Sequence, residues 1–289
     1  MFDFRYHALS LVAVFLALGI GIVLGVTIGD SLVSDAEKNI RASLRGDVVD
    51  ARQDANQARA DLKGRDNLIS GSLPLIADSR LRGRSIAVVG LGSLPGDAEG
   101  AIRNSVELAR GKVDSASTLK VPDELQGLGK AAGGGFAHAS SVRLVRALGR
   151  RIGRAIVRGG RIPKRLDDQL PQRFGGDFKG ADEVALYRSP PKDATGAKAK
   201  TQADQRDAFE EGVVRGLRDA GARIVGVEQS GTDPSQIGWF KDQDLSSVDS
   251  IDLAGGRAAL ILVLEGADGT YGFKKGADRP LPQTGGAGG

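Results

Sequence analysis

Residues 8–29 read ALSLVAVFLALGIGIVLGVTIG, a run of 22 positions without a charged side chain. A helix of this length reaches about 33 Å, which is enough to cross the hydrocarbon core of a bilayer. The next longest apolar run, at residues 258–264, is far too short to do so. We therefore predict one membrane span, an N-terminal transmembrane anchor at residues 1–30, with the rest of the chain outside the bilayer.

The same run raises the alternative of a cleaved signal peptide. Secretory signals have a shorter apolar region, of about 7–15 residues, followed by a small-residue cleavage site. Thr27 and Gly29 could form a weak site of this kind, but the length of the run favours an uncleaved anchor. Basic residues flank the span on both sides, so charge alone does not fix its orientation.

Small residues recur at every fourth position of the span. On a helix they form one smooth stripe, to which the backbone of a second helix can come close. The stripe consists of Ala17, Gly21, Gly25 and Gly29. It predicts helix packing and self-association in the membrane. The simple alternative is that glycine is common in membrane helices and in this chain, which has 42 glycines.

A polar, helix-forming segment follows at residues 31–80. Its apolar positions alternate in steps of three and four, which is the spacing of a two-stranded coiled coil. They are Leu44, Val48, Ala51, Ala55, Ala58, Leu62 and Ile69, and Arg65 interrupts the series. We predict a helical coiled-coil stalk. A single helix packed on the following domain or on a partner is the alternative.

The composition narrows the function classes. The chain has no cysteine, which excludes disulfide scaffolds, thiol catalysis and cysteine zinc sites. The formal net charge is +4, and basic residues gather at 143–165. Only Phe136 and Phe174 flank that cluster, so stacking platforms for bases are few and nucleic acid is disfavoured as a partner. The basic cluster is consistent with a solvated helix face that has no partner. Alternatively, it contacts an anionic envelope polymer or lipid headgroups.

Beyond residue 80, short apolar segments alternate with longer amphipathic ones. The segments with the character of buried strands are residues 85–92, 112–119, 183–187, 223–228 and 257–265. Those with helical periodicity are 98–110, 140–160 and 203–220, whereas 133–135 and 189–200 have the composition of mobile loops. Such alternation predicts a mainly parallel, three-layer α/β (Rossmann-like) domain over residues 81–275, followed by a flexible tail at 276–289.

No catalytic constellation is visible in this domain. The junction GLGSLPG at residues 90–96 has the wrong spacing for a dinucleotide loop and is typical of a plain strand-to-helix turn. No nucleophile can be paired with a base, so we predict that the protein is not an enzyme. As soft or imidazole ligands for copper the chain offers only Met1, His7 and His138, which is too few to predict a metal or cofactor site.

Nearly the whole chain resembles the MctB family, and two parts carry the resemblance most specifically. They are the opening FRYHALSLVAVFLALGIGIVLG at residues 4–25 and the C-terminal half, with VGVEQSGTDPSQIGWF at 225–240 and SSVDSIDLAGG at 246–256. MctB proteins are actinobacterial membrane proteins named for copper transport. The resemblance therefore implies a cell-membrane protein with its large domain outside the cytoplasm and a part in copper homeostasis. Family members also resemble SteB-type proteins, which pair with a membrane partner and influence cell separation through wall hydrolases.

In the C-terminal half, polar and aromatic residues follow the predicted strands rather than filling them. The ends of strands are where a functional surface is expected on an α/β fold. The candidate surface comprises Glu228, Ser230, Trp239, Ser246, Ser247, Asp249, Tyr271 and Lys274, interspersed with Phe240, Val248, Gly269 and Gly272.

Two hypotheses for function follow. The first is a single-pass envelope protein that contributes to copper homeostasis or transport, indirectly or as part of a homo-dimer or higher oligomer. The second is a non-enzymatic scaffold or regulator of cell-wall hydrolysis and cell separation, which acts on an envelope or division protein through its coiled coil.

Overall fold

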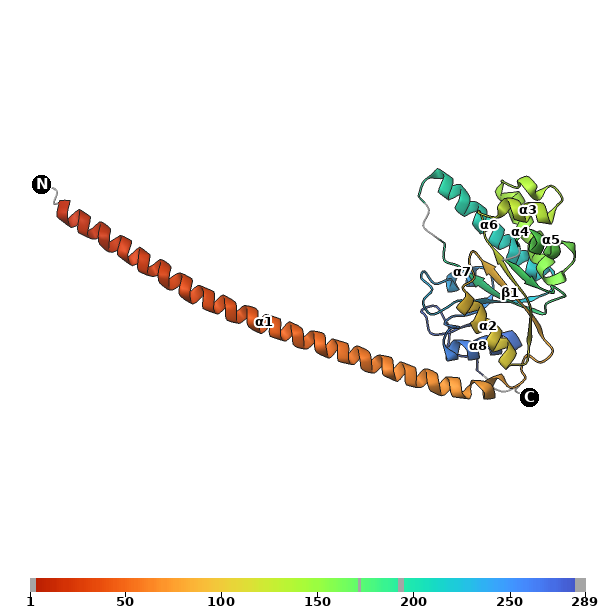
Figure 1. The fold of residues 1–289 in the computed structure, drawn as a ribbon, viewed down its shortest axis with the longest axis horizontal. Helices are drawn as coiled ribbons and strands as arrows, with labels where there is room; N and C mark the ends of the chain where they lie inside the picture. Colours follow the sequence, from red (N-terminus) through yellow and green to blue (C-terminus); the bar gives the residue numbers. More distant parts are fainter. Residues whose placement is uncertain (1–3, 171–172, 192–194, 284–289) are drawn as a thin grey trace. The chain divides into compact units, whose positions relative to one another are not determined.

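The computed structural model describes residues 4–170, 173–191 and 195–283 (Figure 1), with the side chains of residues 4–5, 26–42 and 65 left undescribed. It divides into two compact units, residues 1–64 and residues 65–289. We call the second unit the head. Each unit is considered by itself below.

A single helix, α1, runs from Phe4 to Ala77. Its segment Tyr6–Gly25 has a mean hydropathy of 2.6, and its side chains are all exposed. By length and composition this segment could cross a membrane, although a signal sequence would share both properties. Of the predicted packing stripe, Ala17, Gly21 and Gly25 lie on this segment, and Gly29 falls where side chains are undescribed.

The predicted coiled-coil seam also lies on α1. Six of its positions, Leu44, Val48, Ala51, Ala55, Ala58 and Leu62, are exposed in the first unit. Ile69 is half-buried and belongs to the head. Pairing of two such helices stays a prediction. The last turns of α1 are part of the head core, since Leu73 and Ala77 are buried there.

The head is built on a seven-stranded sheet in the order β3-β2-β1-β4-β5-β6-β7. The strands are β1 (Ser85–Leu91), β2 (Lys112–Leu119), β3 (Phe174–Gly176), β4 (Glu183–Arg188), β5 (Arg223–Val227), β6 (Ser246–Val248) and β7 (Thr270–Tyr271). All neighbouring strands pair in parallel except β2 and β3, which are antiparallel. The predicted mainly parallel α/β fold is therefore confirmed.

Helices cover both faces of this sheet. They are α2 (Gly96–Leu108), α3 (Leu125–Ala132), α4 (Val142–Arg158), α5 (Arg161–Gln169), α6 (Ala197–Asp219), α7 (Ile237–Asp242) and α8 (Ala254–Glu265), with a 3-10 turn at Phe136–His138. Side chains alternate along β1, so Val89 and Leu91 enter one core with α4 and α6, whereas Ile86 and Val88 enter the other with α2 and α8.

Two predictions about local structure were wrong. Residues 257–265 were predicted as the last strand, but they lie in α8. A continuous apolar run that is buried on every side looks the same in a helix and in a strand. Ten residues from Ala254 to Leu264 are buried, and Arg257 is the one polar residue in this range. Residues 189–200 were predicted as a loop, but 197–200 begin α6, and 192–194 lie outside the described residues.

Helices α4 and α6 pack with their backbones almost in contact. Each helix carries two glycines four positions apart, Gly149 and Gly153 on α4 and Gly212 and Gly216 on α6. A Cβ atom added at Gly153 would lie 2.3 Å from the carbonyl oxygen of Val213, and one added at Gly216 would lie 2.2 Å from that of Arg150. Only glycine permits this approach.

The rim of the same helix pair carries ion pairs. Asp219 accepts from Arg150 Nε at 2.5 Å and from Arg154 Nη2 at 2.8 Å. These two hydrogen bonds lower the pKa of Asp219 from 3.8 to about 2. A carboxylate with a depressed pKa stabilises the folded state above its unfolded pKa, and this stability is lost as the pH falls through the folded value.

We therefore expect the acid sensitivity of the head to change in Asp219→Asn. The asparagine variant is less stable than the parent at neutral pH, and the gap closes as the pH falls from about 4 to about 2. The neutral-pH difference is small, below ~1 kcal/mol, because the pair is partly exposed. Urea unfolding at a series of pH values measures it, and a gap that stays constant with pH would contradict the prediction.

Candidate functional site

The polar residues of the head gather where its parallel strands end. Arg188 is the last residue of β4, Glu228 follows β5 directly, and Asp249 follows β6 directly. Because the carboxyl ends of parallel strands meet at the same edge of a sheet, the loops after β4, β5 and β6 come together there.

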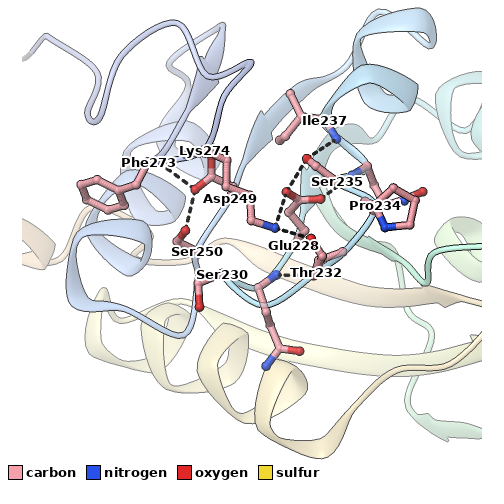
Figure 2. Close-up of polar contacts among 12 residues, drawn as sticks. Glu228, Ser230, Thr232, Pro234, Ser235, Ile237, Asp249, Ser250, Phe273 and Lys274 are labelled. Carbon is pink, nitrogen blue, oxygen red and sulfur yellow. Dashed lines mark hydrogen bonds and ion pairs between the residues drawn. The ribbon is translucent and has the colours of Figure 1, made fainter. Parts of the chain in front are cut away.

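Glu228 lies at the centre of this edge, fully buried (Figure 2). Its Oε1 atom accepts a hydrogen bond from Ser235 Oγ at 2.7 Å and pairs with Lys274 Nζ at 3.0 Å. Its Oε2 atom accepts from the backbone N–H of Gln236 at 2.5 Å. The Lys274 ammonium also donates to the carbonyl of Thr232 at 2.7 Å, so it ties the loop after β5 to the C-terminal segment.

Asp249 is the second fully buried carboxylate of the edge. It accepts from Ser250 Oγ at 2.7 Å and from the backbone N–H groups of Phe273 at 2.8 Å and Lys274 at 3.0 Å (Figure 2). The chain can approach so closely because Gly272 has φ +139° and no side chain: a Cβ there would lie 2.1 Å from the Asp249 carboxyl carbon. Both carboxylates therefore hold the same segment, through Lys274.

Gln236 continues the network toward β4. Its side-chain oxygen accepts from Arg188 Nη1, and Arg188 Nε donates to Glu210 of α6 at 2.7 Å. The guanidinium carbon of Arg188 lies 4.6 Å from the ring centre of Trp239, which is cation–π geometry. Burial raises the pKa of the Glu210 carboxyl above its ordinary value, although the charge of Arg188 opposes the shift.

An open cleft of about 640 Å³ lies beside Glu210. It is lined by residues that follow β1, β2 and β4, among them Ser93, Lys120 and Ser189. Strand β2, which follows β1 in the chain, pairs with one side of β1, and β4 pairs with its other side. The cleft thus lies at the point of the sheet where the strand order reverses, which is the usual ligand position in open α/β sheets.

The sequence matches the family described as "Copper transport outer membrane protein, MctB" over residues 1–168 and 175–282. This match takes in both the apolar N-terminal helix and the carboxyl edge of the head. The chain belongs to the MctB family. No curated protein gave a significant match.

The edge of this MctB-family head brings together three of the eight residues proposed from the sequence. Glu228, Asp249 and Lys274 form one hydrogen-bonded cluster, and Trp239 joins it through Arg188 and Gln236. Ser230 lies on the same side, where its Oγ donates to Asp252 at 2.5 Å.

The side chains of the other three residues lie apart from this cluster, although the Tyr271 carbonyl accepts from the backbone N–H of Asp249 at 2.9 Å. Ser246 begins β6 and thus lies at the opposite edge of the sheet, where its Oγ donates to Asp268 at 3.2 Å. Ser247 is buried within β6, with its Oγ 3.5 Å from that of Thr270. The Tyr271 hydroxyl donates to the carbonyl of Asp268 at 2.7 Å, away from the cluster.

Sequence reasoning missed Arg188, Glu210 and Gln236. A signal for one of them was present: Glu210 stands beside Phe209 and one turn before Val213 and Val214, where the helix face becomes apolar. A carboxylate in that position needs a buried cation, and Arg188 at the end of a buried strand was available.

The cluster of Glu228, Asp249 and Lys274 has the character of a structural network. Each of its carboxylates accepts hydrogen bonds from a neighbouring loop or side chain, and together they tie the loops after β5 and β6 to the C-terminal segment. Among the described residues, no three His, Asp or Glu side chains are grouped so that they could hold a metal ion. His138 is exposed in the 3-10 turn, and Met1 lies outside the described residues.

Proposed function

We propose that the protein is a single-pass envelope protein that contributes to copper homeostasis through its head, outside the cytoplasm, and works as an oligomer. The observation that carries the proposal is the extent of the family match, which includes the apolar helix and the head alike. The family is described by copper transport, so both parts of this chain are candidates for that task.

An indirect contribution fits the chemistry better than a pore. The apolar run contains only Ser10 and Thr27 as polar side chains, and a cation path needs polar groups to replace water. The whole chain has no cysteine and one methionine, the soft ligands that copper(I) prefers. We infer that the protein acts on copper through a partner, and that the cleft at the ends of β1, β2 and β4 is the surface available for it.

The test is the copper content of a deletion strain against the parent and the complemented strain, with cell morphology recorded on the same cultures. Copper that changes on deletion and returns on complementation, without a matching change in zinc, supports the proposal. Unchanged copper with chained or misshapen cells would overturn it in favour of a role in cell separation.

Complementation of the deletion strain with the Gly21→Leu/Gly25→Leu variant tests whether the protein works as an oligomer. These glycines lie on the small-residue stripe, so leucine there is expected to weaken both self-association in crosslinking and the restoration of copper content. Gly19→Leu is the matched control, because residue 19 lies about 200° around the helix from residue 21. Equal crosslinking in the two variants would refute packing through the stripe.

A further inference from the structure

The strongest feature that the proposed function leaves unused is the basic surface of α4 and α5. No acidic residue occurs between positions 142 and 166. The basic residues of this surface are Arg143, Arg146, Arg150, Arg151, Arg154 and Arg158 on α4 and Arg161, Lys164 and Arg165 on α5. All are exposed except Arg146, which is half-buried.

A groove of about 500 Å³ runs along this surface. Four arginines line it, Arg150, Arg151, Arg154 and Arg158, and Phe136 and Ile162 contribute apolar contact. We call it the α4 groove. Arg150, Arg154 and Arg158 follow each other at every fourth residue, so their backbone positions are spaced about 6 Å apart along one side of the helix.

The four guanidinium groups are oriented by the protein itself. Arg150 and Arg154 each donate one N–H group to the Asp219 carboxylate. Arg158 donates one N–H group to the backbone carbonyl of Asp219 at 3.1 Å. Arg151 donates from Nε to the carbonyl of Ala132 at 3.0 Å. A guanidinium has five N–H donors, so each of these contacts leaves further donors for a ligand. Of these four arginines, Arg150 and Arg154 contact a carboxylate, that of Asp219.

We propose that the α4 groove binds a linear anionic glycan, a sugar polymer that carries carboxylate or phosphate groups. Both groups accept paired hydrogen bonds from the planar arginine fork, which a row of lysines would not offer. A row of cations at regular spacing matches a chain of repeating charges. The apolar floor suits the carbon faces of sugar rings.

Two other polyanionic partners fit this surface less well. An amphipathic helix that binds a bilayer inserts its apolar face, but that face of α4 is buried in the head core through Val145, Leu148, Ile152 and Ile156. Single-stranded nucleic acid is bound by aromatic platforms, and Phe136 is the one aromatic residue among those lining the groove.

The test is binding of the full chain, in a zwitterionic detergent, to polygalacturonate over a series of salt concentrations, with inorganic polyphosphate as a polyanion that has no sugar rings. Arg151→Gln/Arg158→Gln removes two groove charges without breaking an ion pair to a side-chain carboxylate. We expect at least tenfold weaker binding than in the parent at about 0.1 M salt, where surface charges are partly screened. The slope of log affinity against log salt should also fall by roughly 1.4, at ~0.7 per lost contact.

Arg82→Gln/Lys275→Gln is the matched control, because it removes two exposed charges from the turn before β1 and from the C-terminal segment. It should keep the affinity of the parent within about twofold, and the fluorescence of Trp239 checks that both variants are folded. An equal loss in the control, no binding of polygalacturonate, or tighter binding to inorganic polyphosphate, phosphatidylglycerol vesicles or single-stranded DNA than to polygalacturonate would overturn the proposal.

Discussion

Gly153→Ala is expected to lower the free energy of unfolding of the head by about 3 kcal/mol, at the upper end of the usual cost of overpacking. The added Cβ would lie 2.3 Å from the carbonyl oxygen of Val213 and 3.1 Å from the backbone nitrogen of Leu217. Both obstacles are backbone atoms of a packed helix, so no side chain can rotate out of the way. Relief requires α4 and α6 to separate along a contact that closes one of the two cores.

Gly100→Ala in α2 is the matched control for this substitution. Residue 100 is also helical, but a Cβ there meets nothing within 4 Å. Alanine should therefore stabilise the head by up to ~1 kcal/mol, because it has the higher helix propensity. Urea unfolding followed by the fluorescence of Trp239, the single tryptophan, measures both variants. A cost below about 0.5 kcal/mol for Gly153→Ala would mean that the close helix contact is not needed.

Lys274→Met is expected to cost the head about 3–5 kcal/mol, because it leaves the carboxylate of Glu228 buried without a cation. Methionine keeps the length and the apolar stem of lysine, so the loss is mainly one of charge. The Glu228 side chain is 0% exposed and that of Lys274 is 17% exposed, so water cannot replace the missing partner at the carboxylate.

Two further variants separate charge pairing from local packing. Lys275→Met changes the neighbouring, exposed lysine and should alter the stability by less than about 0.5 kcal/mol. Glu228→Gln/Lys274→Met removes both charges and should recover part of the loss, since no unpaired ion remains. If Lys274→Met and Lys275→Met unfold at the same urea concentration, the buried ion pair contributes no stability.

The central strands β1, β4 and β5 could be predicted because each contains a run of at least four residues without a charged side chain. Segments such as IAVVGL at residues 86–91 have no helical periodicity and end in a glycine turn. The strands β6 and β7 could not be predicted, since Ser246–Val248 and Thr270–Tyr271 are too short to carry a pattern. Pairing with β5 defines β6, pairing with β6 defines β7, and pairing is a property of the tertiary fold.

The candidate site was predictable to the extent that it depends on chain position. Glu228 was proposed because polar residues at the ends of strands tend to lie at one edge, and Asp249 and Lys274 were proposed with it among the polar and aromatic residues of the C-terminal half. Ser246 was misplaced with them, because β6 was not recognised and the residue stands at its beginning. Arg188 and Glu210 were missed, since their pairing joins a strand end to the middle of a helix.

The burial of Glu228 also bears on how the head is completed during synthesis. Its cation and two donors of Asp249 come from residues 273 and 274, near the end of the chain. Until those residues have left the ribosome, the loop after β5 holds a carboxylate without its counterion, and β6 lacks β7. The nascent head therefore reaches its full stability only after translation passes Lys274. A chain that ends before this residue is less stable and more easily degraded by proteases.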